Sequence, residues 1–299
     1  MLAFLRKVAL ALLLPATACA PAPSTQAPAV AAARPAMWKL ADADTTIYLF
    51  GTIHALPAGR QWRTAEFDRA LGSADELVLE VADVGDMAAT TSAMQKLGLS
   101  PGLPPIAERV PEAKRAALRA AIAQSGIPEA VYDRLETWAA AIPILGVMFK
   151  NLGVDATLGV EQQIGAPFKA GANKKVTGLE SIEEQFGFFD TMTEEAQRAL
   201  LASALDDPAA AKAEFKAMLD AWSSGDVKGI ERTFVEAEMT PELKTALFSR
   251  RNARWADWLA KRLDTPGTVF VAVGAGHLAG DESVQAKLKA KGLKTTRVQ

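Results

Sequence analysis

The chain of 299 residues contains only two histidines and one cysteine, and these scarcities limit its chemistry. Because Cys19 is the only cysteine, no disulfide can form within the chain, and cysteine redox chemistry inside the folded part is excluded. The sequence has no HExxH, GxSxG or Walker motif, so a zincin, a serine hydrolase and an NTPase have no support. The 33 basic residues are spread among 35 acidic ones without forming a block, so nothing indicates a nucleic-acid partner.

Residues 1–20 have the pattern of a secretory signal peptide, with two basic residues, a short apolar run and then small residues. The apolar run is too short to span a bilayer. Cleavage after Ala18 would leave Cys19 at the new N-terminus, as in a lipoprotein, whereas cleavage after Ala20 would remove it. Loss of the two leader cations changes the formal net charge from −2 to −4. We therefore expect secretion across the inner membrane, to the periplasm or to a lipid anchor at Cys19.

The rest of the chain divides into a tether and one folded unit. Residues 21–36 are rich in proline and alanine, which is typical of a flexible linker. Residues 37–299 are long enough for one sizeable core. We expect a sheet built from residues 37–86 and 264–299, with a helical insertion over residues 87–263. The sequence does not indicate an oligomeric state.

Both histidines stand in the same local setting. The motifs Gly51-Thr-Ile-His54 and Gly274-Ala-Gly-His277 each end a β-branched and aromatic run that predicts a buried strand. In open α/β sheets, ligands collect outside the carboxyl ends of the strands, where a glycine permits a tight turn. Two such turns on neighbouring strands would give a pair of metal ligands or an acid/base pair.

A third candidate, Glu80, lies at the end of another predicted strand. Residues 76–81 are almost wholly apolar, as in a strand buried in a parallel sheet, and an amphipathic helix over Trp62–Leu71 precedes them. This βαβ pattern places Glu80 at the same edge as His54. The alternative is a surface carboxylate at a strand end, but an unpaired carboxylate among apolar neighbours would be costly.

The insertion has a helical pattern, interrupted by one strand candidate, Lys175–Leu179, which delivers Glu180. Near the C-terminus we expect a helix over Glu282–Ala290 and a closing strand over Leu293–Val298. The fold class is therefore α/β (α+β), a small, mostly parallel sheet made from both chain ends with a large helical insertion. The predicted helices of the insertion are Glu112–Gln124, Glu129–Phe149 with an interruption at Pro143, Ala156–Ile164, Ile182–Phe189, Glu194–Leu205, Ala209–Trp222 and Pro241–Leu263.

The residues that carry the chemistry are His54, His277 and Glu80, with Glu180 and Asp155 as further carboxylates. Two imidazoles and one or two carboxylates match a catalytic Zn, Mn, Co or Fe site with open positions for water. Such an ion lowers the pKa of bound water and polarises a carbonyl, so hydrolysis follows naturally. The alternative is that the histidines are hydrogen-bonded structural residues.

Several segments, in order along the chain, resemble the TraB/GumN family, whose animal relatives are the Tiki proteins. The paired Gly-x-x-His motifs are the most specific of these. The segments are Met37-Trp-Lys-Leu, Leu49–His54, Glu76–Val81, Gly153–Leu158, Val176–Gln185, Arg251-Asn252 and Val273–Gly280.

The resemblance implies a metal-dependent, peptidase-like domain, with manganese or cobalt suggested by the Tiki members. The ligand set itself also allows zinc. Carried over by position, the residues that it implies for activity are His54, Glu80 and His277.

The same resemblance marks residues with less certain roles. Glu180 and Gln185 match one further motif, while Asp155, Arg251 and Asn252 match helical positions. We expect Arg251 to pair with Glu180 or Asp155, or to hold a substrate carboxylate.

Two classes of function remain open. The first is a metal-dependent hydrolase, a peptidase acting on a peptide or protein in the cell envelope. The second is a non-catalytic periplasmic protein that binds haem or a signalling peptide, or assists exopolysaccharide assembly. Fold alone does not decide between them.

Overall fold

The computed structural model describes residues 33–82, 85–235 and 244–299. The predicted signal peptide, Cys19 and most of the linker lie outside the described residues. Within them, no helix is both long and apolar enough to cross a membrane.

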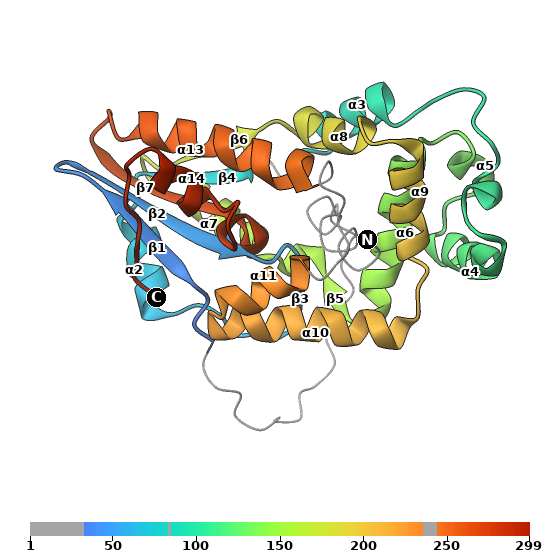
Figure 1. Ribbon diagram of the computed structural model, residues 1–299, viewed down its shortest axis with the longest axis horizontal. Helices are drawn as coiled ribbons and strands as arrows, with labels where there is room; N and C mark the ends of the chain where they lie inside the picture. The colour runs from blue at the N-terminus through green and yellow to red at the C-terminus, as the bar shows by residue number, and fades with distance from the viewer. Residues whose placement is uncertain (1–32, 83–84, 236–243) are drawn as a thin grey trace.

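A six-stranded sheet forms the centre of one half of the molecule (Figure 1). Its strand order is β6-β4-β7-β2-β1-β8. The strands are β1 (Met37–Ala41), β2 (Thr45–Thr52), β4 (Glu76–Val81), β6 (Lys175–Glu180), β7 (Gly267–Gly274) and β8 (Thr296–Arg297).

Strand β7, from the C-terminal part of the chain, lies between two strands from the N-terminal part. It pairs in parallel with β2, where Thr52 lies opposite Gly274, and in parallel with β4, where Leu79 lies opposite Ala272. The predicted βαβ pattern is thus parallel, but β2 and β4 are not neighbours. Because all three strands run in the same direction, their carboxyl ends meet at one edge of the sheet.

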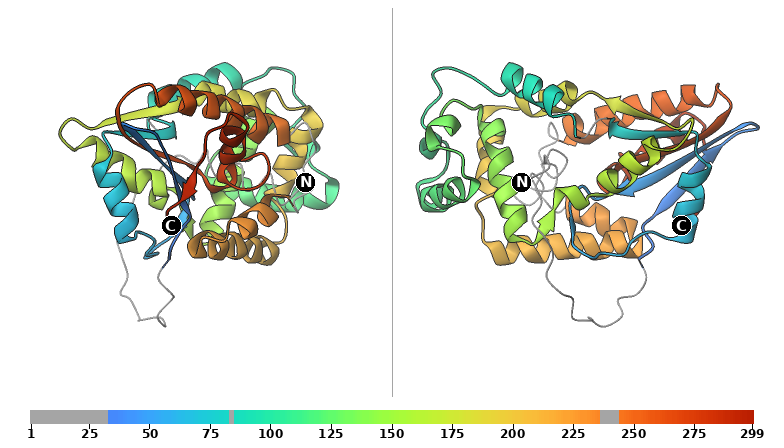
Figure 2. Two further views of the ribbon diagram at one scale, coloured as in Figure 1. Left: turned by 60° about the vertical axis from the view of Figure 1, so that its left-hand side comes forward. Right: turned by 180° about the vertical axis from the view of Figure 1, so that it is seen from behind.

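The two faces of the sheet are covered by different helices (Figures 1 and 2). On β7, Val271 and its alternate neighbours pack with α13 (Arg250–Arg262) and α14 (Val284–Ala290). Phe270 faces the other way, against Phe50 and Phe67, the latter from α2 (Ala65–Ser73). Burial on both faces explains the continuous apolar run of this strand.

Residues 87–263 are mostly helical, and one strand within them, β6, joins the sheet beside β4. Helices α6 and α9 stand at the end of the molecule away from the sheet, and α10 runs along one side (Figure 1). The α-helices are α3 (Met87–Leu97), α4 (Arg115–Ser125), α5 (Glu129–Tyr132), α6 (Thr137–Asn151), α7 (Val160–Lys169), α8 (Ile182–Asp190), α9 (Glu194–Ser203), α10 (Pro208–Ser224) and α11 (Val227–Val235).

The six-stranded sheet and the helices between its strands confirm the predicted α/β class with a helical insertion. Short elements complete the architecture. Strands β3 (Leu56–Pro57) and β5 (Val154–Asp155) form a second small sheet. The single-turn helices are η2 (Ile106–Arg109), η3 (Glu112–Lys114), η4 (Ala156–Leu158), η5 (Thr245–Ser249) and η6 (Ala275–Leu278).

The predicted interruption of the 129–149 helix at Pro143 is wrong. Pro143 lies inside α6, where burial of nine of the 15 residues outweighs the lost backbone hydrogen bond. The chain leaves helical geometry at 133–136 instead. There the buried Arg109 guanidinium donates to the carbonyls of Asp133 (2.8 Å) and Leu135 (2.6 Å), which satisfies backbone groups outside any helix.

Other boundaries also differ from prediction. The closing strand is only the two residues of β8, and α14 begins after Ser283, whose side chain accepts from the Ala286 N–H. Helices α3 and α11 were not predicted. The first residues of the predicted helix 241–263 lie outside the described residues, and its described part begins with the π-turn η5.

Replacing Phe270 tests whether its contacts with Phe50 and Phe67 hold the two chain ends together. We expect Phe270→Ala to lower the free energy of unfolding by about 3–5 kcal/mol, because the residue is fully buried and its truncation leaves a cavity in the core. Val131→Ala, at a position 43% exposed, is the control and should stay within about 0.5 kcal/mol. Urea unfolding measures both. Equal small losses would show that this core is not what joins the ends.

Candidate functional site

The three leading candidate residues lie at the same edge of the sheet. His54 follows the end of β2, Glu80 is the penultimate residue of β4, and His277 lies on η6 directly after β7. Since β7 pairs with both other strands, the three side chains come from adjacent positions.

Gly274 is the point around which these side chains gather. A Cβ atom at this position would lie 3.0 Å from Nε2 of His54 and 3.2 Å from Oε1 of Glu80. Nε2 of His277 lies 3.7 Å from the same Glu80 oxygen. The backbone N–H of Gly274 also donates to that oxygen at 2.7 Å. The structure therefore brings the predicted trio together, and a glycine is required here because atoms of His54 and Glu80 occupy the space of a side chain.

His54 is held from behind by Glu161, on the first turn of α7. The two side chains form an ion pair, with Nδ1 of His54 2.7 Å from Oε1 of Glu161. Helix α7 docks closely on this turn, since a Cβ atom at Gly159 would lie 2.2 Å from the His54 carbonyl oxygen. Sequence reasoning missed Glu161 because a glutamate in the first turn of a helix is ordinary.

Glu161 also sets the charge of His54. Burial lowers the pKa of the imidazole, but the charges of Glu161 and Glu80 outweigh this effect and raise the pKa to about 9. The side chain of His54 is 19% exposed, compared with 7% for Glu80 and 6% for His277. It is therefore the member of the trio that solvent reaches most easily, and it is cationic near neutral pH.

His277 is held by Asn252, from α13. Nδ2 of Asn252 donates to the carbonyl of Glu282 at 2.7 Å, so its Oδ1 faces Nδ1 of His277 at 2.6 Å. This arrangement assigns the proton to Nδ1, so Nε2 can accept from the NH1 group of Arg251 at 3.2 Å. The rings of Phe248 and Trp255 pack on the imidazole, with centroids 4.9 and 4.4 Å away.

The surroundings of His277 keep it neutral. Burial and the charge of Arg251 lower its pKa to about 3, and the opposing effect of Glu80 is smaller. The two histidines of the chain are thus in opposite charge states at neutral pH.

Arg251 links the carboxylates of this edge. Its NH2 group donates to Glu80 and to Glu180, both at 2.7 Å, and its Nε donates to Glu180 at 3.0 Å. Burial raises the pKa of Glu80, but the charge of Arg251, aided by the charge of His54 and the Gly274 N–H, outweighs this effect and holds the pKa below its usual range. The predicted pairing of Arg251 with Glu180 is present in the structure.

The other candidate residues divide into two groups. Gln185 donates to Glu80 at 3.1 Å, and Trp255 donates to Glu180 at 3.1 Å, so both belong to the cluster. Asp155 does not share these contacts: its exposed side chain accepts from the Thr157 N–H at 2.7 Å and caps η4. It acts as a capping residue and not as the predicted partner of Arg251.

The donor chemistry of the trio fits a metal ion. Metal-binding histidines commonly have their second ring nitrogen held by a carboxylate or a carbonyl oxygen, as Glu161 and Asn252 hold His54 and His277 here. The positions of these side chains fit an ion less well than their chemistry does. Across residues 33–82, 85–235 and 244–299, no three His, Cys, Asp or Glu side chains are arranged to hold an ion. In addition, NH1 of Arg251 lies 3.2 Å from Nε2 of His277.

The two imidazoles can be followed separately because the chain has no other histidine. In the metal-free protein we expect His54 to titrate near pH 9 and His277 to stay neutral down to about pH 3. Glu161→Gln should lower the pKa of His54, because burial and Arg251 then act with less opposition. Imidazole NMR titration measures both, with Glu195→Gln as an exposed control.

The raised pKa of His54 also makes the stability of the fold depend on pH. The folded-state pKa of His54 exceeds its ordinary value of 6.5, so its ion pair stabilises the fold fully below pH 6.5. This contribution is lost as the pH rises through about 9. Urea unfolding between pH 6 and 10 should show a smaller decline for Glu161→Gln than for the parent protein. Identical declines, or two histidines that both titrate near 6.5, would contradict the assigned environments.

A methyl group at Gly274 tests the close approach directly. Gly274→Ala should displace His54 and Glu80, shift the imidazole signal of His54 and cost about 1–3 kcal/mol of stability through overpacking. Gly187→Ala, on α8, places the same methyl group where no atom lies within 4 Å and should leave the signal unchanged. An unchanged His54 signal in Gly274→Ala would show that the site is looser than described.

The chain is similar in sequence to proteins from three bacteria. The chain is 26% identical over 242 residues to the uncharacterized protein YbaP of Escherichia coli, covering 81% of this chain and 87% of that protein. The same figures hold for YbaP of Shigella flexneri. An uncharacterized protein of Treponema pallidum is 25% identical over 165 residues, which is 51% of this chain but only 49% of that protein. No solved structure matches the chain.

The family model of TraB/PrgY/gumN matches residues 36–297, which include both Gly-x-x-His motifs, Glu80 and Arg251. The resemblance read from the motifs is thereby confirmed, and the chain belongs to the TraB/PrgY/gumN family.

Proposed function

We propose that the chain is a metal-dependent hydrolase, a peptidase that acts on a peptide or protein in the cell envelope. One observation carries the proposal. Nε2 of His277 lies 3.7 Å from Oε1 of Glu80, and this oxygen and Nε2 of His54 both border Gly274. The two imidazoles come from opposite ends of the chain, and their Nδ1 atoms are held by Glu161 and Asn252. Pre-oriented imidazoles with a carboxylate are the ligand set of hydrolytic metal sites.

The residues that would hold the ion are His54, His277 and Glu80. A divalent ion such as Mn, Co or Zn supplies a water of lowered pKa, about 7 for zinc, and polarises the scissile carbonyl. Without an ion, the imidazole of His54 is protonated near neutral pH, and it must lose a proton from Nε2 to bind one. Metal affinity should therefore rise with pH towards 9.

Glu80 suits the role of ligand better than that of general base. Its two carboxylate oxygens accept from the N–H groups of Gly274, Gln185 and Arg251. These donors hold its pKa below the usual range, and a carboxylate so stabilised removes a proton from water poorly. Arg251 therefore maintains the charge of Glu80, and Glu180 balances the charge of Arg251.

The proposed location rests on the leader pattern of residues 1–20. The protein would act in the periplasm, or at a membrane surface if Cys19 carries a lipid.

A second function, binding without catalysis, is favoured by the position of Arg251. Its NH1 group approaches the same His277 nitrogen that an ion would use, so the guanidinium serves as the resident cation of the cluster. In that case the site would hold an anionic or peptide ligand and would need no metal.

Metal titration and cleavage assays separate the two functions. Protein dialysed against EDTA should gain thermal stability with Mn, Co or Zn, because the ion binds only the folded state. With the ion present, it should cleave members of a proteome-derived peptide mixture followed by mass spectrometry. His54→Ala, His277→Ala and Glu80→Gln should each lower cleavage by at least about 100-fold, since second-shell changes alone cost about 10–100-fold.

The exposed Glu195→Gln is the matched control for Glu80→Gln and should retain full cleavage. Cleavage that survives all three site changes would sink the assigned roles. An unchanged melting temperature together with no cleavage would favour the binding protein.

A further inference from the structure

Charge is distributed unevenly along the chain. Residues 244–299 hold 11 of the 33 lysines and arginines but only four of the 35 aspartates and glutamates. Their formal net charge is +7, whereas residues 1–243 together carry −9. An asymmetry of this size indicates that the basic part of the chain meets an anionic partner.

The fold gathers many of these cations on one surface. Helices α13 and α14 lie next to each other on the same face of the sheet (Figures 1 and 2). Their inner sides are buried in the apolar cluster that contains Val271, so their outer sides face solvent. An exposed stripe at helical spacing runs along α13: Arg250, Arg254, Asp257 and Lys261.

Ion pairs within the protein use some of the charges on this surface. Asp257 of α13 pairs with Lys291, which follows α14, and Glu282 pairs with Lys287. Arg254 donates to the buried Glu180 at 2.9 Å. These contacts join the two helices to each other and to the sheet, and their charges largely cancel.

Other cations of this surface remain without such a partner. Among residues 33–82, 85–235 and 244–299, no acidic group forms an ion pair with four exposed cations: Arg250, Lys261, Lys289 and Lys294. The remaining acidic residues of this part of the chain are only Asp264 and Asp281. The outer side of α13 and α14 therefore carries an excess of positive charge that the protein does not neutralise.

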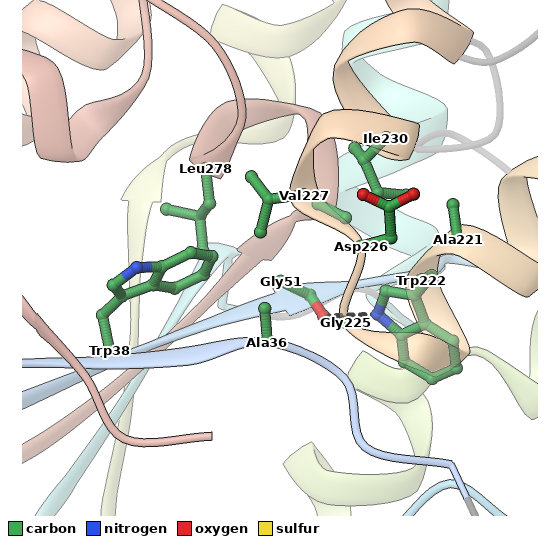
Figure 3. Close-up of a pocket in the computed structure, with 11 residues that line it drawn as sticks. Ala36, Trp38, Gly51, Ala221, Trp222, Gly225, Asp226, Val227, Ile230 and Leu278 are labelled. Atoms are coloured by element: carbon green, nitrogen blue, oxygen red, sulfur yellow. Dashed lines mark hydrogen bonds between the residues drawn. The ribbon is translucent and has the colours of Figure 1, made fainter.

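Arg297 marks the limit of this surface at the edge of the sheet. Its guanidinium lies 5.8 Å from the ring centre of Trp38 and donates to the carbonyl of Gly225 at 2.7 Å. Trp38 in turn faces Leu278 of η6 and Val227 of α11 across an apolar hollow (Figure 3). Because Arg297 is engaged by the protein itself, the cations available to a partner are those of α13, α14 and the turn after α14.

The chemistry of these cations favours a charged surface over a single bound anion. Three of the four are lysines, whose compact ammonium groups are strongly hydrated, whereas a single carboxylate or phosphate is gripped best by the fork of an arginine. Lysines on the outside of two helices suit diffuse attraction to lipid headgroups. The leader pattern of residues 1–20, which predicts export, makes the membrane the anionic surface that the chain would meet.

We infer that the outer side of α13 and α14 docks on a membrane surface that contains anionic phospholipids. The inference does not depend on the proposed hydrolase function. Helix α13 then serves two purposes, because its inner side carries Arg251 and Asn252 of the candidate site while its outer side carries Lys261. The rest of the chain, with its excess of acidic residues, is repelled by the same headgroups, so the molecule approaches the membrane in one orientation.

Co-sedimentation with vesicles tests this inference. The full chain should bind vesicles of phosphatidylglycerol and phosphatidylcholine in equal amounts at least about 10-fold more strongly than vesicles of phosphatidylcholine alone. The triple variant Lys261→Glu, Lys289→Glu, Lys294→Glu should lose at least about nine-tenths of this preference. Salt at about 0.5 M should abolish it in the parent chain, because the ions screen the attraction. The leader is the same in every variant, so its own affinity for lipid does not affect the comparison.

A matched control separates this surface from net charge alone. Arg119→Glu, Lys150→Glu and Lys212→Glu together change the charge equally at exposed positions of α4, α6 and α10. This triple variant should keep the preference within about twofold. Glutamine at positions 261, 289 and 294 removes the cations without adding acidic groups and should give an intermediate loss. Thermal unfolding of every variant checks that a loss of binding is not a loss of fold.

Three outcomes would overturn the inference. The first is a parent chain that binds both kinds of vesicle equally. The second is an equal loss of preference in the two glutamate triple variants, since the effect would then come from net charge. The third is retention of the parent chain by duplex DNA or an acidic protein without binding to anionic vesicles, which would assign the surface to another partner.

Discussion

The parallel pairing of β7 with β2 on one side and β4 on the other is the constraint on which this molecule depends. It joins strands whose paired residues are 193 positions apart for β4 and 222 for β2, and it fixes Thr52 opposite Gly274. Because backbone hydrogen bonds set this register, the turns that follow the strands cannot slide relative to one another. The positions of His54, Glu80 and His277 are therefore a property of the sheet, and a rigid sheet is a better support for a chemical site than a free loop.

The second requirement is electrostatic. Carboxylates, imidazoles and a guanidinium lie together at an edge where little solvent enters, and removing each charge from water is costly. Arg251 reduces this cost because its planar group donates to Glu80 and Glu180 at once, which a lysine ammonium would not match. Glu161 does the same for His54 from the other side. The cluster is consequently asymmetric, with one cationic histidine near solvent and one neutral histidine in the interior.

Much of the fold and of the candidate site could be predicted, because the sequence patterns that mark them are local. The two Gly-x-x-His motifs and the apolar strand before Glu80 each depend on neighbours within a few residues. The insertion of β7 between β2 and β4 was not predictable in the same way, because strand order depends on contacts between distant segments. Glu161 was missed for a related reason: its partner lies on another element, and nothing near it in sequence marks it.

The central claim is that both ends of the chain supply ligands to one ion. A crystal grown from EDTA-treated protein and soaked in Mn²⁺, measured for anomalous scattering, tests it most directly. The account predicts one strong peak within about 2.0–2.3 Å of Nε2 of His54, Nε2 of His277 and a Glu80 oxygen, with the Arg251 NH1 group withdrawn from His277. A site without a peak at saturating manganese, with Arg251 still bound to His277, would contradict it.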